Sequence, residues 1–133
     1  MFRVYDTKKR KWLKENIYLT PNYDLYMSKK NLFGIERLKL LQDSHYVYHR
    51  AIDLFDKNEQ LIYEGDYLKC KVSEDKIVYG LVTYAIELSA YVILCVDSDE
   101  FYTLGSEVCE FIEVVGNVFD GYDGEESDGN KTL

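Results

Sequence analysis

The segment from residue 52 to residue 69, IDLFDKNEQLIYEGDYLK, restricts the fold of this chain more than any other part of the sequence. Two apolar runs, 52–55 and 61–63, flank the polar residues 56–59. Asp and Asn tolerate left-handed backbone and hydrogen-bond their own main chain, so these four residues predict a hairpin turn. Gly65 interrupts the strand pattern that follows, and it predicts a sharp bend into a second sheet or around a small barrel.

Short β-type runs separated by turn residues recur along the rest of the chain, which indicates a mainly β fold. Composition agrees, because Tyr is abundant (13 of 133 residues) and favours strands, and Pro occurs once. We predict one domain over residues 1–119, with a small, strongly bent barrel or sandwich of SH3-like character at about 46–119. An amino-terminal hairpin precedes it, and residues 120–133 are predicted to be an acidic, disordered tail.

Two local features leave room for alternatives. Residues 32–41 fit either one short helix, with Asn31 as its N-cap, or a strand, and the pattern does not decide between them. Gly80 lies inside the β-branched run 77–85, where a glycine is typical of a β-bulge.

The central segment resembles the YopX family, small proteins of phages and prophages in low-GC Gram-positive bacteria. The family pattern is Gly-Leu-x-Asp-Lys-Asn-Gly-Lys-x-Ile-Tyr-Glu-Gly-Asp followed by a hydrophobic residue. Here Asp53 and Glu59 stand where the pattern has Gly, and Gln60 stands at a usually basic position. Residues 2–13 and 113–119 resemble the opening and closing segments of the same family.

The resemblance implies an accessory phage protein and no particular activity. We interpret the residues that fit the pattern as structural, because Asp near a turn usually accepts hydrogen bonds from neighbouring amides. These family-motif residues are Asp56, Lys57, Asn58, Ile62, Tyr63, Glu64, Gly65 and Asp66, together with Gly116 and Asn117 of the closing segment.

Residues with catalytic or metal-binding chemistry form no recognisable motif. The sequence has no phosphate-binding glycine loop and no nucleophile elbow. His45 and His49 would lie about 13 Å apart on a strand, too far to chelate one ion. We therefore assign no catalytic residue, cofactor or metal, and the sequence favours a protein that is not an enzyme.

Charge is distributed unevenly along the chain, whose net charge is −8. The amino-terminal region carries a basic cluster that we mark as a partner contact: Arg3, Lys8, Lys9, Arg10 and Lys11. Residues 97–128 contain eleven Asp or Glu and no Lys or Arg. These opposed charges predict association with a host or phage protein, or of the chain with itself.

The alternative hypothesis is a nucleic-acid-binding barrel that uses the basic amino-terminal hairpin. The negative net charge disfavours it, because phosphate neutralisation drives such binding. We expect no membrane partner, since no apolar run approaches the roughly 18 to 20 residues of a transmembrane helix. The amino end lacks the apolar core of a signal peptide, and three well-separated Cys residues fit a reduced compartment, so we expect a cytoplasmic protein.

Overall fold

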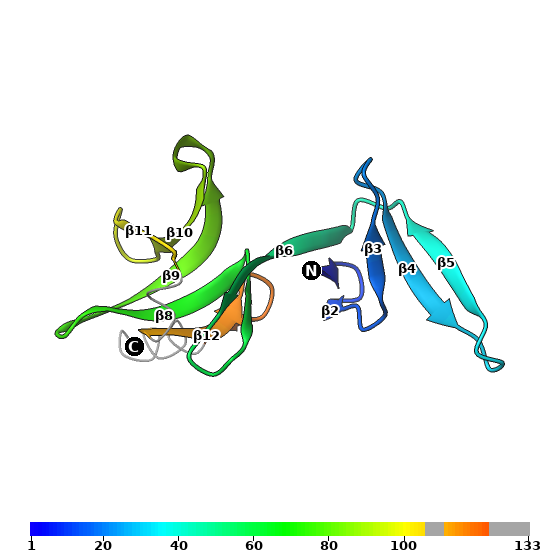
Figure 1. Ribbon diagram of the computed structural model, residues 1–133, viewed down its shortest axis with the longest axis horizontal. Coiled ribbons are helices and arrows are strands. Elements are labelled where there is room, and N and C mark those ends of the chain that lie inside the picture. Colours follow the sequence, from blue (N-terminus) through cyan, green and yellow to red (C-terminus); the bar gives the residue numbers. More distant parts are fainter. Residues whose placement is uncertain (106–110, 123–133) are drawn as a thin grey trace. The chain divides into compact units, whose positions relative to one another are not determined.

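The computed structural model of the chain describes residues 1–105 and 111–122, and its regular secondary structure is almost entirely β-strand (Figure 1). By contacts, the chain divides into two compact units. Unit 1 comprises Met1–Arg50, and unit 2 begins at Ala51. The prediction of a mainly β fold is confirmed.

Unit 1 holds a hairpin and a three-stranded antiparallel sheet. Its strands are β1 (Phe2–Asp6), β2 (Lys11–Trp12), β3 (Ile17–Leu19), β4 (Leu25–Lys30), β5 (Glu36–Leu41) and the first half of β6 (Tyr46–Phe55). β1 pairs with β2 as the predicted amino-terminal hairpin and with β6 on its other side, while β3, β4 and β5 pair in chain order. The core of the unit consists of Val4, Leu25, Met27 and Leu41.

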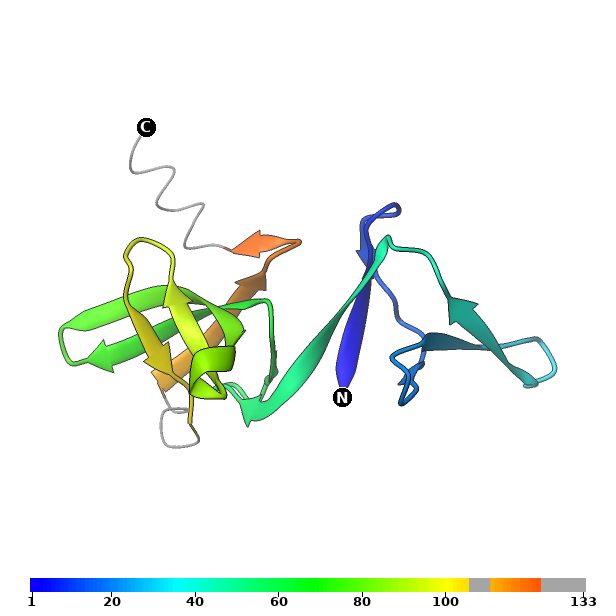
Figure 2. The ribbon, with the colours of Figure 1, turned by 90° about the horizontal axis from the view of Figure 1, so that it is seen from above.

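Unit 2 is a strongly curled antiparallel sheet that forms half a barrel (Figure 2). The sheet has the strand order β11-β10-β9-β8-β12-β13. Besides the second half of β6, the elements are β7 (Leu61–Tyr63), β8 (Asp66–Ser73), β9 (Lys76–Ala85), the 3-10 helix η1 (Ile86–Leu88), β10 (Ala90–Cys95), β11 (Phe101–Thr103), β12 (Ile112–Asn117) and β13 (Gly121–Tyr122).

The core of unit 2 follows from the two-residue period of its strands. On β9, Val78, Gly80 and Val82 are buried while the residues between them are more exposed. On β8, Leu68 and Cys70 face the same core, to which Ile62, Ile93 and Ile112 also contribute. Apolar side chains that alternate in this way line the concave side of a curled sheet, because successive side chains point to opposite faces.

The chain leaves one sheet and enters another at Gly65, as predicted. β7 pairs with β6, and β8 belongs to the six-stranded sheet. Gly65 lies between β7 and β8 with φ +84°, a conformation that residues with a Cβ rarely adopt. Its amide donates to Val82 O and its carbonyl accepts from Val118 N, so the bend is fixed on both sides.

Residues 36–41 form a strand, β5, so the helical alternative for 32–41 is wrong. The predicted bulge at Gly80 is also wrong, because β9 pairs through Gly80 with β8 and β10 without a register shift at that residue. A Cβ at Gly80 would meet Ile93 Cγ2 and lie 2.8 Å from Leu94 O, so glycine is needed there for close approach of β10. β13 lies within the range predicted as a tail, and residues 123–133 lie outside the described residues.

Candidate functional site

A cationic pocket in unit 1 is the candidate functional site. It encloses about 310 Å³, and five lysines from three segments of the chain line it: Lys9, Lys11, Lys14, Lys29 and Lys39. Its other lining residues are Asp6, Trp12, Leu13, Glu15, Met27 and Tyr46. Five lysines and only two acidic residues line this hollow, which favours binding of an anion.

Asp6 shapes the turn that brings two of these lysines into place. The side chain of Asp6 is buried, and its Oδ1 accepts the amides of Lys8 and Lys9 at 3.0 and 3.1 Å. The hydrogen bond from Lys9 and other contacts, including the charge of His45 at 3.7 Å, hold the pKa of Asp6 below its usual value. The carboxylate is therefore charged, and it is used by the turn that carries Lys8 and Lys9.

The register of β4 and β5 places two more lysines at the pocket. Lys39 lies opposite Met27, and Lys29 lies opposite Arg37, so these four side chains share the face that buries Met27. Like charges directly opposite each other destabilise a sheet. Within residues 1–105 and 111–122, neither Lys29 nor Lys39 forms an ion pair with a carboxylate. An anionic partner would remove this repulsion.

Two aromatic residues line the pocket, Trp12 and Tyr46, and Trp12 is already packed on several sides. The Arg3 guanidinium lies 4.4 Å from the centroid of the Trp12 ring, and the rings of Tyr5 and His49 lie 5.0 and 5.9 Å away. Burial, and to a lesser extent the charge of Arg3, lowers the pKa of His49 to about 4. This packed group supports the pocket wall and leaves Trp12 little free surface on which a base could stack.

The two units carry opposite net charge. Residues 1–50 contain eleven Lys and Arg and five Asp and Glu, which gives +6. Residues 51–133 contain five Lys and Arg and nineteen Asp and Glu, which gives −14. The cationic pocket therefore lies in the basic half of the chain. The net charge of the whole chain, −8, gives no indication of this basic half.

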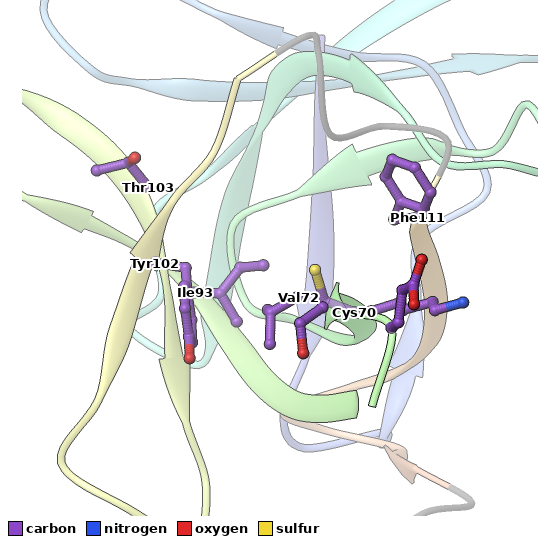
Figure 3. A pocket seen from close by; sticks show the side chains of 9 residues that line it. Cys70, Val72, Ile93, Tyr102, Thr103 and Phe111 are labelled. Atoms are coloured by element: carbon purple, nitrogen blue, oxygen red, sulfur yellow. The ribbon is translucent and has the colours of Figure 1, made fainter. Parts of the chain in front are cut away.

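Unit 2 has a second cavity, of about 570 Å³, on the inner side of the curled sheet (Figure 3). Cys70 and Val72 of β8, Ile93 of β10, Tyr102 of β11 and Phe111 contribute to its lining. Burial raises the pKa of the Cys70 thiol, and Cys95 raises it further. The thiol is therefore protonated at neutral pH, which makes it a poor nucleophile.

Among the described residues, no three His, Cys, Asp or Glu side chains lie close enough together to hold a metal ion. In the part of the chain that the structure describes, no helix is long and apolar enough to cross a membrane.

The motif segment makes contacts across unit 2. Asp56 is buried; its Oδ1 accepts the amides of Asn58 and Gln60, and its Oδ2 accepts the amide of Val114 at 2.9 Å. The Lys57 amide donates to Ile112 O, and its ammonium lies 3.3 Å from Glu113. The turn after β6 is thus attached to β12 through both backbone and side chains.

Comparison with known proteins identifies the family of this chain. The family model described as YopX protein matches residues 1–121. The chain belongs to the YopX family. No curated protein matches it.

Two solved YopX-family structures share this fold. The crystal structure of yopX from Bacillus subtilis is 12% identical, with a TM-score of 0.62 over 89% of this chain and 91% of that one. The crystal structure of EF1440 from Enterococcus faecalis is 18% identical, with a TM-score of 0.51 over 89% of this chain and 92% of that one.

The remaining YopX motif residues lie around the Gly65 bend or at the end of β12, before the turn to β13. Ile62 is fully buried, and the buried carboxylate of Asp66 accepts the Tyr63 amide at 2.8 Å. Glu64 is partly buried beside them. At the other end of the motif set, Gly116 follows a register shift in β12.

The Gly116–Asn117 pair sets the turn between β12 and β13. A Cβ at Gly116 would collide with Gly121 O. Asn117 Oδ1 accepts the amides of Phe119 and Asp120, both at 3.0 Å. These contacts fit the structural role expected for the motif, which stays a prediction.

The basic residues marked as a partner contact separate into three groups. Lys9 and Lys11 line the pocket, Lys8 and Arg10 are exposed on the same turn without lining it, and Arg3 packs on Trp12. Sequence reasoning missed Lys14, Lys29, Lys39 and Tyr46. Assigning 36–41 as a strand would have revealed Lys39, because alternation then places Arg37, Lys39 and Leu41 on one face.

Proposed function

We propose that this YopX-family chain is a phage- or prophage-encoded accessory protein that is not an enzyme and acts by protein–protein or self-association. Its cationic pocket is the surface that recognises an acidic segment of a protein partner. One observation carries the proposal: five lysines converge on one hollow, within a unit of charge +6. The phage origin rests on the family resemblance alone.

The geometry favours carboxylates on a folded or extended protein over a nucleic-acid backbone. Residues 51–133, with a net charge of −14, repel a long polyanion that passes near them, whereas a short acidic segment can occupy the pocket alone. Single-strand binding gains much of its affinity from bases stacked on aromatic rings. Arg3, Tyr5 and His49 already surround Trp12, and the ring of Tyr46 packs on that of His45 at 4.1 Å, so both aromatic rings at the pocket are already engaged.

Nucleic acid is the second candidate because of one observation, the direct apposition of Lys29 and Arg37 on β4 and β5. Two cations at this spacing are suited to neighbouring phosphates as well as to carboxylates. An interface of this kind would be strongly salt-dependent and would show little sequence preference.

The test compares an oligoglutamate peptide with a single-stranded oligonucleotide of equal charge, both fluorescently labelled, by anisotropy at low salt. We expect the peptide to bind more tightly than the oligonucleotide. The double variant Lys11→Glu/Lys14→Glu should weaken peptide binding by roughly tenfold, which corresponds to about 1.4 kcal/mol for two reversed contacts.

The matched control is Lys8→Glu/Arg10→Glu, which makes the same charge change at exposed positions that do not line the pocket. It should weaken binding much less. If the control and the pocket variant lose affinity equally, the pocket is not the site. If the oligonucleotide binds more tightly than the peptide, nucleic acid is the partner class, and if neither probe binds, both proposals fail.

A further inference from the structure

Unit 2 has a small pocket of its own that is lined mainly by lysines. It encloses about 220 Å³, and its lining residues are Lys57, Lys69, Lys71, Ile77, Phe111 and Glu113. Its lysines are three of the five Lys and Arg residues within 51–133, a part of the chain that carries −14. Cations that gather at one place on an acidic unit indicate a site for an anionic group.

The register of the strands places this lysine pocket of unit 2 on the face of the sheet opposite the core. Lys69 of β8 lies opposite Tyr79 of β9 and Glu113 of β12. Lys71 lies opposite Ile77. Residues paired in this way share a face, and the buried residues of β8 and β9, which alternate with them, point to the other face. The pocket therefore belongs to the outer face of the curled sheet.

Two of the three lysines lack a carboxylate partner. The Lys57 ammonium lies 3.3 Å from Glu113, the acidic residue of the lining. Among the described residues of unit 2, neither Lys69 nor Lys71 forms an ion pair. Lys71 also borders the larger cavity together with Glu74, but these two side chains are not an ion pair either. The outer face therefore carries two lysines without a counterion in the described part of the chain.

The last described residue of the chain, Tyr122 of β13, lies on the same face. The centroid of its ring is 4.5 Å from that of Tyr67 and 5.6 Å from that of Tyr79. Tyr67 precedes Lys69 on β8 by two residues, so their side chains point to the same side of the sheet. Residues 123–133 therefore follow a tyrosine that is seated on the face of the lysine pocket.

The direction of β13 leads from Tyr122 towards the two lysines. β8 and β13 are both antiparallel to β12, so they run the same way. Tyr67 and Tyr122 both pair with Gly116, which places them at the same level across the sheet. Lys71 lies four residues further along β8, roughly 13 Å in an extended strand. The next four residues of the chain, 123–126, span about the same distance when extended.

We propose that the acidic segment that follows Tyr122 occupies the lysine pocket of unit 2 in the same copy of the chain. Its sequence, DGEESDGNKTL, contains four acidic residues and one lysine. The carboxylates of Glu125 and Glu126 are within reach of the two lysines that lack a counterion. A tethered segment acts at a high effective concentration, so even weak ion pairs are enough to hold it. The pocket is thus a site for a short acidic peptide, and the chain itself supplies that peptide.

The experiment is zero-length carbodiimide cross-linking of the full chain at low salt, followed by proteolysis and mass spectrometry. The reagent joins a carboxylate to an amine only where the two are in contact. We expect links from Glu125 or Glu126 to Lys69 or Lys71. High salt should suppress these links, because the contacts are between exposed charges.

Two ion pairs of the structure serve as internal controls for the reaction. Lys57 lies 3.3 Å from Glu113, and Lys76 lies 3.0 Å from Glu100, so both pairs should cross-link in the same sample. An equal mixture of isotope-labelled and unlabelled chain identifies links between copies by their mixed mass. We expect the links of the acidic segment to join residues of one copy.

A charge variant gives a second measurement that does not use the reagent. Lys69→Gln/Lys71→Gln should shift the backbone amide signals of Glu125 and Glu126 in NMR spectra of the full chain. The matched control Lys8→Gln/Arg10→Gln removes two exposed charges from unit 1 and should leave these signals in place. Circular dichroism checks that both variants are folded.

The inference is overturned if the control pairs react and the acidic segment does not link to Lys69 or Lys71. Links to the lysines of unit 1, links between copies, or amide signals that do not respond to the charge variant would also overturn it. The function proposed above depends on other lysines, so it is tested separately. Lys69→Gln/Lys71→Gln should keep its affinity for oligoglutamate, and a loss there would count against the unit 1 pocket alone.

Discussion

Asp56 accepts a hydrogen bond from the backbone amide of Val114 at 2.9 Å, although 58 residues separate them in the chain. The other oxygen of the same carboxylate accepts the amides of Asn58 and Gln60. One buried side chain therefore shapes the turn after β6 and attaches that turn to β12. Carboxylates that accept several backbone amides are among the stronger hydrogen-bonding groups in proteins.

Replacement of Asp56 by Ala should destabilise unit 2 strongly. Three backbone amides lose their acceptor, and buried donors without partners are costly, so we expect a loss of about 2–4 kcal/mol in the free energy of unfolding. Urea denaturation followed by circular dichroism measures it. Asp75→Ala removes an exposed carboxylate from the β8–β9 turn and should change stability by less than about 0.5 kcal/mol. Equal losses in both variants would contradict the role given to Asp56.

Gly65→Val should abolish the cooperative unfolding of unit 2. The position has φ +84°, and a β-branched residue is especially unfavourable there. The amide and carbonyl of Gly65 are both used, by Val82 and Val118, so the backbone cannot relax without losing these bonds. Gly65→Asn is the graded comparison, since Asn tolerates left-handed backbone, and it should fold with a lower Tm. A valine variant that melts like the unmodified chain would refute this reading of the bend.

His49 should make the stability of unit 1 depend on pH between about 6.5 and 4. Burial and the nearby Arg3 lower its pKa from 6.5 to about 4 in the folded chain. The unfolded state therefore binds a proton first as the pH falls, and stability drops through this range. Trp12 lies beside His49, so its fluorescence reports the unfolding of this region. His49→Gln should flatten the pH dependence there, and an unchanged slope would show that another group is responsible.

Periodicity predicted the mainly β fold because the buried residues of β8 and β9 alternate, as in Leu68, Cys70, Val78 and Val82. Residues 36–41 could not be assigned in this way. Four of the six apolar side chains in residues 32–41 are exposed, namely Leu32, Phe33, Ile35 and Leu38, so they follow no core-facing pattern. A periodicity argument assumes that apolar residues are buried, and this hairpin breaks that assumption.

Only some residues of the candidate site could be predicted from the sequence. Lys9 and Lys11 stand out as part of a basic cluster, whereas Lys29 and Lys39 join them only through the register of β4 and β5. Register depends on which face is buried, and long-range pairing is not encoded in any local pattern. Gly80 shows the same limit, since the close approach of Ile93 that requires a glycine comes from a neighbouring strand.

The two glycines of the YopX pattern that this chain lacks fall at positions of left-handed backbone. Asp53 has φ +61° and Glu59 has φ +63°. The left-handed region costs a residue with a Cβ about 1–2 kcal/mol, less for Asp, whose side chain can hydrogen-bond locally. The pattern therefore records backbone geometry at both positions, and this chain adopts that geometry at an energetic cost.

Restoring the second of these glycines should stabilise the protein. Glu59→Gly removes the strain, and the greater freedom of the unfolded chain offsets part of the gain, so we expect an increase of about 0.5–1 kcal/mol. Asp53→Gly should give a smaller increase, because Asp tolerates this backbone better than Glu. Glu74→Gly, at an exposed turn position without positive φ, is the control and should lose stability slightly. Denaturant midpoints rank the three variants. A Glu59→Gly variant no more stable than the control would show that positive φ at this turn carries no strain.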